Sequence, residues 1–177
     1  MKGITIMIIE DQEQEAIVAE VAVKKAFNIP SEKEGRYLGL ESIKEKLGLP
    51  DSRLYELGDD ELLHIITARN LNEAMEGFKK IDEFRIAFQK VGIITDLMFP
   101  GKTGNIQANG IEIILLAIEK SMPVVVCSDT DHHDVGFMSS LARTLGPLHP
   151  NGRIPVILDK KDWEKAVAEL IHILKPE

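Results

Sequence analysis

The sequence lacks the residues that several classes of protein require. Its single cysteine, Cys127, excludes an internal disulfide and is typical of a reducing compartment. It has no run of basic residues and a formal net charge of -8, so we expect no nucleic-acid partner, because binding to phosphate backbones needs clustered lysine and arginine. It has neither a GxxxxGK[ST] loop nor a GxGxxG turn, so nothing supports a nucleotide-binding site of those types.

Long hydrophobic runs are absent as well. The first apolar run, residues 3–9, ends at Glu10 and Asp11 and has no small-residue cleavage site after it, so it is neither a membrane span nor a signal peptide. We therefore expect a cytoplasmic protein without a membrane partner. The apolar and charged fractions, 44% and 28%, are typical of a globular chain, and the length suits a single domain over residues 1–177.

Segments typical of strands and of helices alternate along the chain. Short apolar runs rich in β-branched residues indicate buried strands, and apolar residues at helical spacing follow each of them. The predicted strands are Gly3–Ile9, Glu61–Thr67, Gly92–Thr95, Pro123–Cys127 and Ile154–Leu158, and the predicted helices are Gln12–Phe27, Asn70–Lys80, Ile111–Lys120, Val135–Leu145 and Trp163–Leu174. This order predicts an α/β fold with a doubly wound, five-stranded parallel sheet that helices cover on both faces.

Two segments lengthen this plan. Residues 28–60 contain prolines and glycines but also several apolar residues, so we interpret them as an insertion with one short helix, Glu41–Leu47, between the first helix and the second strand. Residues 102–109 lengthen the loop after the third strand. The last predicted helix ends close to Glu177, so we expect no separate output domain.

Polar residues that suit phosphoryl chemistry follow the predicted strands. They are Glu10 and Asp11 after the first strand, Asp96 after the third, Ser128 after the fourth, and Lys160 and Lys161 after the fifth. The active sites of open parallel sheets lie at the carboxyl ends of the strands, so we expect these side chains to converge. Clustered carboxylates suit Mg²⁺, a carboxylate can accept a phosphoryl group, and a lysine and a hydroxyl neutralise the transferred oxygens.

Four stretches that carry these residues resemble the receiver domain of two-component response regulators. They are IIEDQ at residues 8–12, TDLMFPG at 95–101, PVVVCS at 123–128 and PVILDKKDW at 155–163. The resemblance covers nearly the whole chain apart from the insertion and implies the flavodoxin-like topology of that family. It implies a signalling protein, and not an enzyme, that takes a phosphoryl group from a histidine kinase or a phosphotransfer protein. Because we expect no separate output domain, we expect this protein to be stand-alone. Its output would then pass through protein–protein contacts with an unidentified partner.

The same resemblance assigns roles to the acids. Asp96 would be the phosphoacceptor. Glu10 and Asp11 would hold Mg²⁺ together with Asp96, Asp11 more directly, and the backbone carbonyl of Met98 would complete the protein ligands. Without the resemblance, these acids are also good helix-cap and turn residues.

The remaining assignments meet departures from the family pattern. Ser128 would bind the phosphoryl oxygen, and Lys160 would pair with the carboxylate. Lys161 is the alternative, because the lysine–proline pair usual in the family is absent. Ile157 stands three residues before Lys160, where the family usually has an aromatic residue, and Asp129 follows Ser128 where a small residue is usual.

Two alternative functions remain. One is a receiver-like interaction module that is never phosphorylated, because Asp129 and residues 102–109 block the site. The other is a Mg²⁺-dependent phosphohydrolase, although Met98 stands where that class offers a second acid. We expect His132 and His133 to lie in a solvated loop or at the start of a helix, since adjacent side chains point in different directions and do not share a metal easily.

Overall fold

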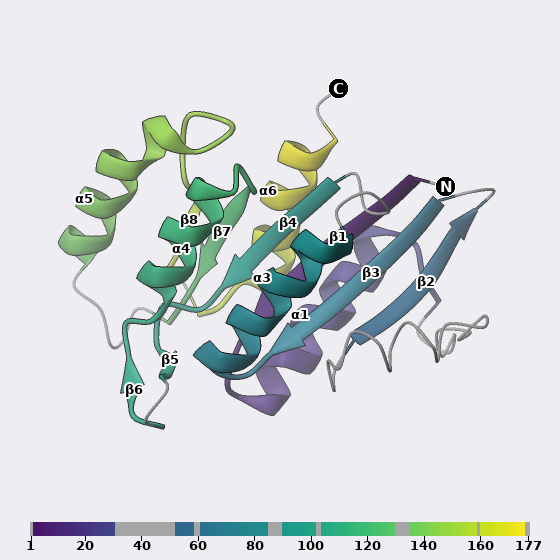
Figure 1. Ribbon diagram of the computed structural model, residues 1–177, viewed down its shortest axis with the longest axis horizontal. Helices are drawn as coiled ribbons and strands as arrows, with labels where there is room; N and C mark the ends of the chain where they lie inside the picture. Colours follow the sequence, from purple (N-terminus) through teal and green to yellow (C-terminus); the bar gives the residue numbers. More distant parts are fainter. Residues whose placement is uncertain are drawn as a thin grey trace.

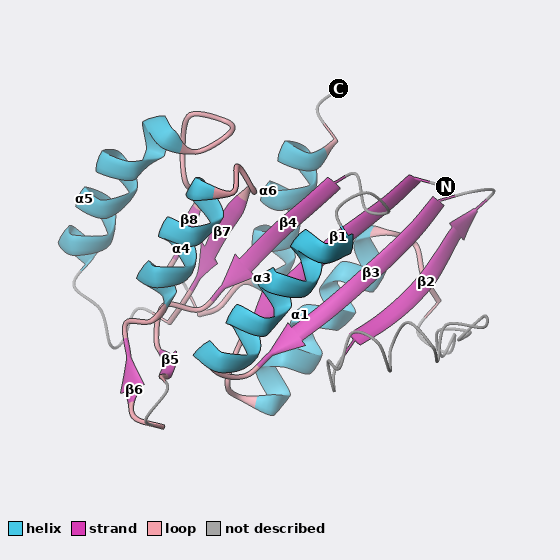
Figure 2. Ribbon diagram, in the orientation of Figure 1, coloured by secondary structure: helices cyan, strands magenta, loops and turns pink. Residues whose placement is uncertain are grey.

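The computed structural model describes residues 2–30, 52–58, 61–84, 90–101, 104–129, 135–158 and 160–175. Its strands are β1 (Lys2–Ile9), β2 (Ser52–Gly58), β3 (Glu61–Ala68), β4 (Lys90–Thr95), β5 (Phe99–Pro100), β6 (Ile106–Gln107), β7 (Val124–Cys127) and β8 (Val156–Ile157). Its helices are α1 (Glu13–Ala26), α3 (Leu71–Phe84), α4 (Gly110–Glu119), α5 (Val135–Leu145) and α6 (Trp163–Leu174), with a 3₁₀ turn at Gly146–Leu148 (Figure 1, Figure 2). Within these ranges, no helix combines the length and the apolar character needed to cross a bilayer. The predicted helix Glu41–Leu47 and the pair His132 and His133 lie outside the described residues.

Six strands form one mostly parallel sheet, in the order β2-β3-β1-β4-β7-β8. The parallel strands β3, β1, β4, β7 and β8 correspond to the five predicted strands. From β1 the chain moves to β3 on one side and then crosses to β4 on the other. The strand order therefore reverses between β1 and β4, an arrangement compatible with a flavodoxin-like fold.

The sixth strand, β2, corrects the prediction of a five-stranded, wholly parallel sheet. It pairs antiparallel with β3 at the edge of the sheet, inside the segment that we interpreted as an insertion with one short helix. Its burial depends on distant residues: the Tyr55 hydroxyl donates to Glu20 of α1 at 3.0 Å, and Arg53 lies 2.6 Å from the same carboxylate. Because this anchor is a tertiary contact, sequence periodicity gave no indication of it.

Side-chain alternation along the strands divides the core into two layers. On β1, Met7 and Ile9 pack with α3 and α4, whereas Ile6 and Ile8 pack with α1 and α6. Figure 1 shows α3 and α4 in front of the sheet and α1 and α6 behind it. Helices thus cover both faces, as the sequence predicts, and the polar strand ends meet at one edge.

The chain after β4 contains a small hairpin where we predicted only a longer loop. β5 and β6 pair antiparallel, with Phe99 opposite Gln107, and α4 starts soon afterwards at Gly110. The hairpin extends past the carboxyl end of β4, at the bottom of Figure 1. Of the predicted loop 102–109, the first two residues lie outside the described ranges.

Candidate functional site

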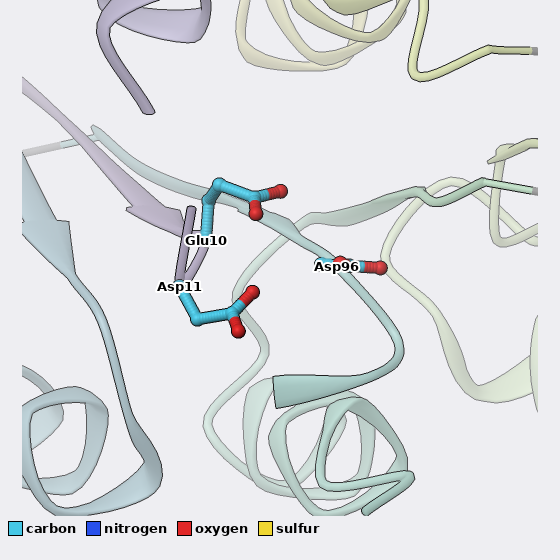
Figure 3. Close-up of side chains that lie close together, drawn as sticks. All are labelled: Glu10, Asp11 and Asp96. Atoms are coloured by element: carbon cyan, nitrogen blue, oxygen red, sulfur yellow. The ribbon is translucent and has the colours of Figure 1, made fainter. Parts of the chain in front are cut away.

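The carboxyl ends of β1 and β4 bring three acidic side chains together. Glu10 and Asp11 directly follow β1, and Asp96 directly follows β4. One carboxylate oxygen from each residue lies within 4.8 Å of the other two (Figure 3). The strand ends are level, because the parallel register places Ile9 opposite Thr95 and the Asp96 amide donates to the Ile9 carbonyl at 2.9 Å. The structure thus brings together the three acids that the sequence predicts at this edge.

Both oxygens of the Asp96 carboxylate have hydrogen-bond donors. Oδ1 accepts from the Ser128 hydroxyl and from the Leu97 amide, each at 2.6 Å, and more weakly from the Met98 amide at 3.4 Å. Oδ2 lies 2.9 Å from Nζ of Lys161. Only 3% of Asp96 is exposed, so its negative charge is stabilised by these groups and not by bulk water.

Lys161, and not Lys160, is the lysine of this site. Its Nζ lies 2.8 Å from Glu10 Oε2 as well as close to Asp96, and the residue is buried, whereas Lys160 is exposed. The assignment of Lys160 is therefore corrected by one residue. Both lysines have left-handed backbones, with φ of 50° and 48°. That conformation favours glycine or asparagine, so two consecutive lysines gave no indication of how the chain turns after Ile157.

Burial and neighbouring charges set the protonation of Glu10 and Lys161. Burial raises the pKa of Glu10 to about 7, and the charge of Asp96 adds to this, against opposing hydrogen bonds from Lys161 and the Gln12 amide. Burial by itself would lower the pKa of Lys161, but the hydrogen bonds and charges of Glu10 and Asp96 outweigh it and raise the pKa. Lys161 therefore remains charged and serves as the counter-ion of the acids.

The donor set suits a hard divalent cation. The carboxylates of Glu10, Asp11 and Asp96 are the oxygen ligands that Mg²⁺ prefers. Ligands of one Mg²⁺ lie within about 4.2 Å of each other when each bond is about 2.1 Å, so small side-chain adjustments would bring these oxygens, now within 4.8 Å, into range. Asp11 is half-buried, and Figure 3 shows its carboxylate, like that of Glu10, directed toward Asp96. The residues present fit the ion that the sequence predicts.

The departures from the receiver pattern are also found at this edge. Asp129 is half-buried directly after Ser128. Ile157 is a buried core residue. With Lys161 as the site lysine, the position three residues before it is Leu158, which is also aliphatic. The site therefore has no aromatic side chain in the place where the family usually has one.

Two residues at this edge were not predicted from the sequence to belong to the site. Asn109 donates its side-chain amide to the Phe99 carbonyl at 2.5 Å, and the Gly110 amide donates to the Leu97 carbonyl at 3.0 Å. Both contacts hold the segment that follows Asp96. The available indication was an Asn-Gly pair just before a strongly apolar helix, which marks a tight connection.

Comparison with known proteins assigns no family to this chain. No family model matches the sequence, and no curated protein matches it.

Proposed function

We propose that this chain contains a receiver domain in which Asp96 accepts a phosphoryl group. The main support for this proposal is the environment of the Asp96 carboxylate. The Ser128 hydroxyl lies 2.6 Å from one of its oxygens and the Lys161 ammonium 2.9 Å from the other. Two further acids lie beside it. A nucleophile, a cation site, a hydroxyl and a lysine are the groups that phosphoryl transfer uses. The position of the acids, where the strand order reverses, supports the flavodoxin-like topology of receivers.

The donor in this proposal is a phosphohistidine on a histidine kinase or a phosphotransfer protein. An oxygen lone pair of Asp96 attacks the phosphorus, the phosphorus–nitrogen bond breaks, and its electron pair remains on the imidazole nitrogen. Lys161 and Ser128 then stabilise the phosphoryl oxygens of the acyl phosphate. Mg²⁺, held by Glu10, Asp11 and Asp96, would add positive charge at the same oxygens.

Ser128 links the chemistry to a change in the protein surface. Its hydroxyl now donates to Asp96 Oδ1, and a phosphoryl group on Asp96 would offer acceptors farther from β4. If the hydroxyl followed those acceptors, Ser128 and the adjoining Asp129, at the carboxyl end of β7, would move. A partner that prefers one of the two arrangements then shifts the population toward it.

A second candidate is a receiver-like interaction module that is not phosphorylated. The observation in its favour is burial: Glu10 exposes 0% and Asp96 3% of their surface, and Lys161 bridges their carboxylates. In this alternative, the ion pair is a structural element and partner binding does not depend on Mg²⁺.

Labelling with a small phosphodonor separates the candidates. The protein is incubated with acetyl phosphate and Mg²⁺, and a hydroxylamine-sensitive phosphoryl adduct is sought by intact mass spectrometry. We expect label on the wild type and none on Asp96→Asn. Asp82→Asn, which changes an exposed aspartate on α3, is the matched control and should label like the wild type. Equal labelling of Asp96→Asn would exclude Asp96 as acceptor, and an unlabelled wild type would favour the interaction module.

A further inference from the structure

The backbone from Asp96 to Phe99 is held by the residues that begin α4. The Leu97 carbonyl accepts from the Gly110 amide at 3.0 Å, and the Phe99 carbonyl accepts from the Asn109 side chain at 2.5 Å. These contacts link the residues before the β5–β6 hairpin to the residues that follow it. They fix the segment that carries Asp96 against the first turn of the helix.

Asn109 occupies the N-cap position of α4 without capping it. An N-cap asparagine usually accepts a hydrogen bond from an amide in the first turn of its own helix. Asn109 has a helical backbone, with φ -66° and ψ -18°, and makes no capping hydrogen bond. Its side chain, in a residue only 9% exposed, donates to Phe99 instead. The side chain therefore secures the Asp96 segment and not its own helix.

Gly110 allows this segment to lie unusually close to α4. A Cβ atom at Gly110 would lie 2.4 Å from the Asp96 carbonyl oxygen and 2.7 Å from Leu97 Cα. Real Cβ atoms do not approach backbone atoms that closely, and these atoms cannot move without moving Asp96. Any side chain at this position would therefore force α4 and the backbone of Asp96 and Leu97 apart.

Met98 lies in the middle of the held segment, and its carbonyl is left available. The Asp96 carbonyl accepts from the Thr95 hydroxyl at 2.6 Å, and those of Leu97 and Phe99 are bonded as above. In the part of the chain that the structure describes, the Met98 carbonyl accepts no hydrogen bond. A backbone carbonyl of this kind is a suitable oxygen ligand for Mg²⁺.

We propose that Asn109 and Gly110 are positioning residues for the cation site. They hold the carboxylate of Asp96 and the carbonyl of Met98 in a fixed relation through the hydrogen bonds and the close packing described above. Neither residue touches the ion. This inference rests on the proposed Mg²⁺ site at the acids, and it makes the start of α4, which follows β6, part of that site.

The test measures Mg²⁺ affinity of the full chain by isothermal titration calorimetry. Loss of a partner that orients a metal ligand typically weakens binding by about 10- to 100-fold, so we expect Asn109→Ala to lose about 10-fold and Gly110→Ala at least as much. Asn151→Ala is the matched control, because that asparagine also makes side-chain hydrogen bonds, to His149 and Arg153, but beside the amino end of β7. We expect the Mg²⁺ affinity of Asn151→Ala to stay within about two-fold of the wild-type value. That change is smaller than the one expected when a metal ligand loses the partner that orients it.

Thermal unfolding without metal identifies a merely structural role. If weaker Mg²⁺ binding only reflected lower stability, Asn151→Ala would weaken it as much as an equally destabilised Asn109→Ala. Equal weakening by the two asparagine variants, or a folded Asn109→Ala with wild-type Mg²⁺ affinity, would overturn the inference. If Gly110→Ala does not fold, the result for Asn109→Ala alone decides. When the wild type binds and Asp96→Asn does not, such a failure leaves the proposed cation site standing. Absence of binding to the wild type overturns both.

Discussion

Replacing Lys161 with methionine tests whether this ammonium balances the buried acids. Methionine keeps most of the side-chain volume but removes the charge that lies 2.8 Å from Glu10 and 2.9 Å from Asp96. These groups are nearly inaccessible to water, because the exposed fraction of the side chain alone is 7% for Lys161, 0% for Glu10 and 5% for Asp96. Removing one member of a buried ion pair usually costs about 3–5 kcal/mol, because the remaining charge is uncompensated. We expect a loss of that size in the free energy of unfolding at pH 8 without metal.

The cost should depend on pH, and the pKa of Glu10 gives the sign. Because burial raises this pKa from 4.5 to about 7, the folded chain binds the proton more tightly than the unfolded chain. Stability from this group is therefore complete below pH 4.5 and falls as the pH rises to about 7, by about 3 kcal/mol in all. Removing Lys161 removes a hydrogen bond that lowers the pKa of Glu10, so the decline continues to higher pH. The variant should lose more stability relative to the wild type at pH 8 than at pH 5.

Urea unfolding at the two pH values, in the presence of a chelator, measures the difference. Trp163, the only tryptophan of the chain, is 2% exposed and reports unfolding by fluorescence. Lys160→Met is the matched control, because it removes the same charge from the exposed neighbour, and we expect little change. Adding Glu10→Gln to Lys161→Met should recover part of the stability. An equal cost at both pH values, or an equal cost for the two lysines, would refute the role of Lys161 as counter-ion.

Two further predictions concern buried ionisable groups away from the acids. Burial lowers the pKa of His64 on β3 to about 4, so its contribution is complete above pH 6.5 and is lost as the pH falls to about 4, by about 3 kcal/mol. Between pH 6.5 and about 4, His64→Leu should lose less stability than the wild type. His172→Leu, which changes an exposed histidine, is the control and should behave like the wild type. Identical acid unfolding of the wild type and both variants would contradict this prediction. Glu20 accepts from Tyr55 and pairs with Arg53, and so links α1 to β2. Glu20→Ala should destabilise the protein by about 1–3 kcal/mol, because the buried Tyr55 hydroxyl loses its acceptor. Hydrogen exchange should accelerate in β2 more than in β7, and a uniform acceleration would argue against a local tie.

The parallel strands were predictable because both of their faces are buried. Such strands are continuous apolar runs in the sequence, as in Gly92–Thr95, and helices at 3.6-residue spacing follow them. β2 was not predictable in this way, since it lies at the sheet edge and depends on Glu20 for its buried contacts. The same distinction applies to the site. Glu10, Asp11 and Asp96 follow long, well-defined strands, whereas Lys161 follows a strand of two residues and a left-handed turn.

The charges of the site set the order of events in the proposed reaction. With all groups ionised, Glu10, Asp11 and Asp96 carry three negative charges and Lys161 carries one positive charge, which leaves a net charge of -2. A divalent cation matches this deficit. Phosphorylation replaces the single charge of Asp96 with a group of about -1.5 to -2, so transfer without a bound cation would add negative charge to an uncompensated buried site. We therefore expect Mg²⁺ to bind before the phosphoryl group arrives. Labelling should then saturate with Mg²⁺ concentration at the affinity measured by calorimetry, and labelling in a chelator would contradict this order.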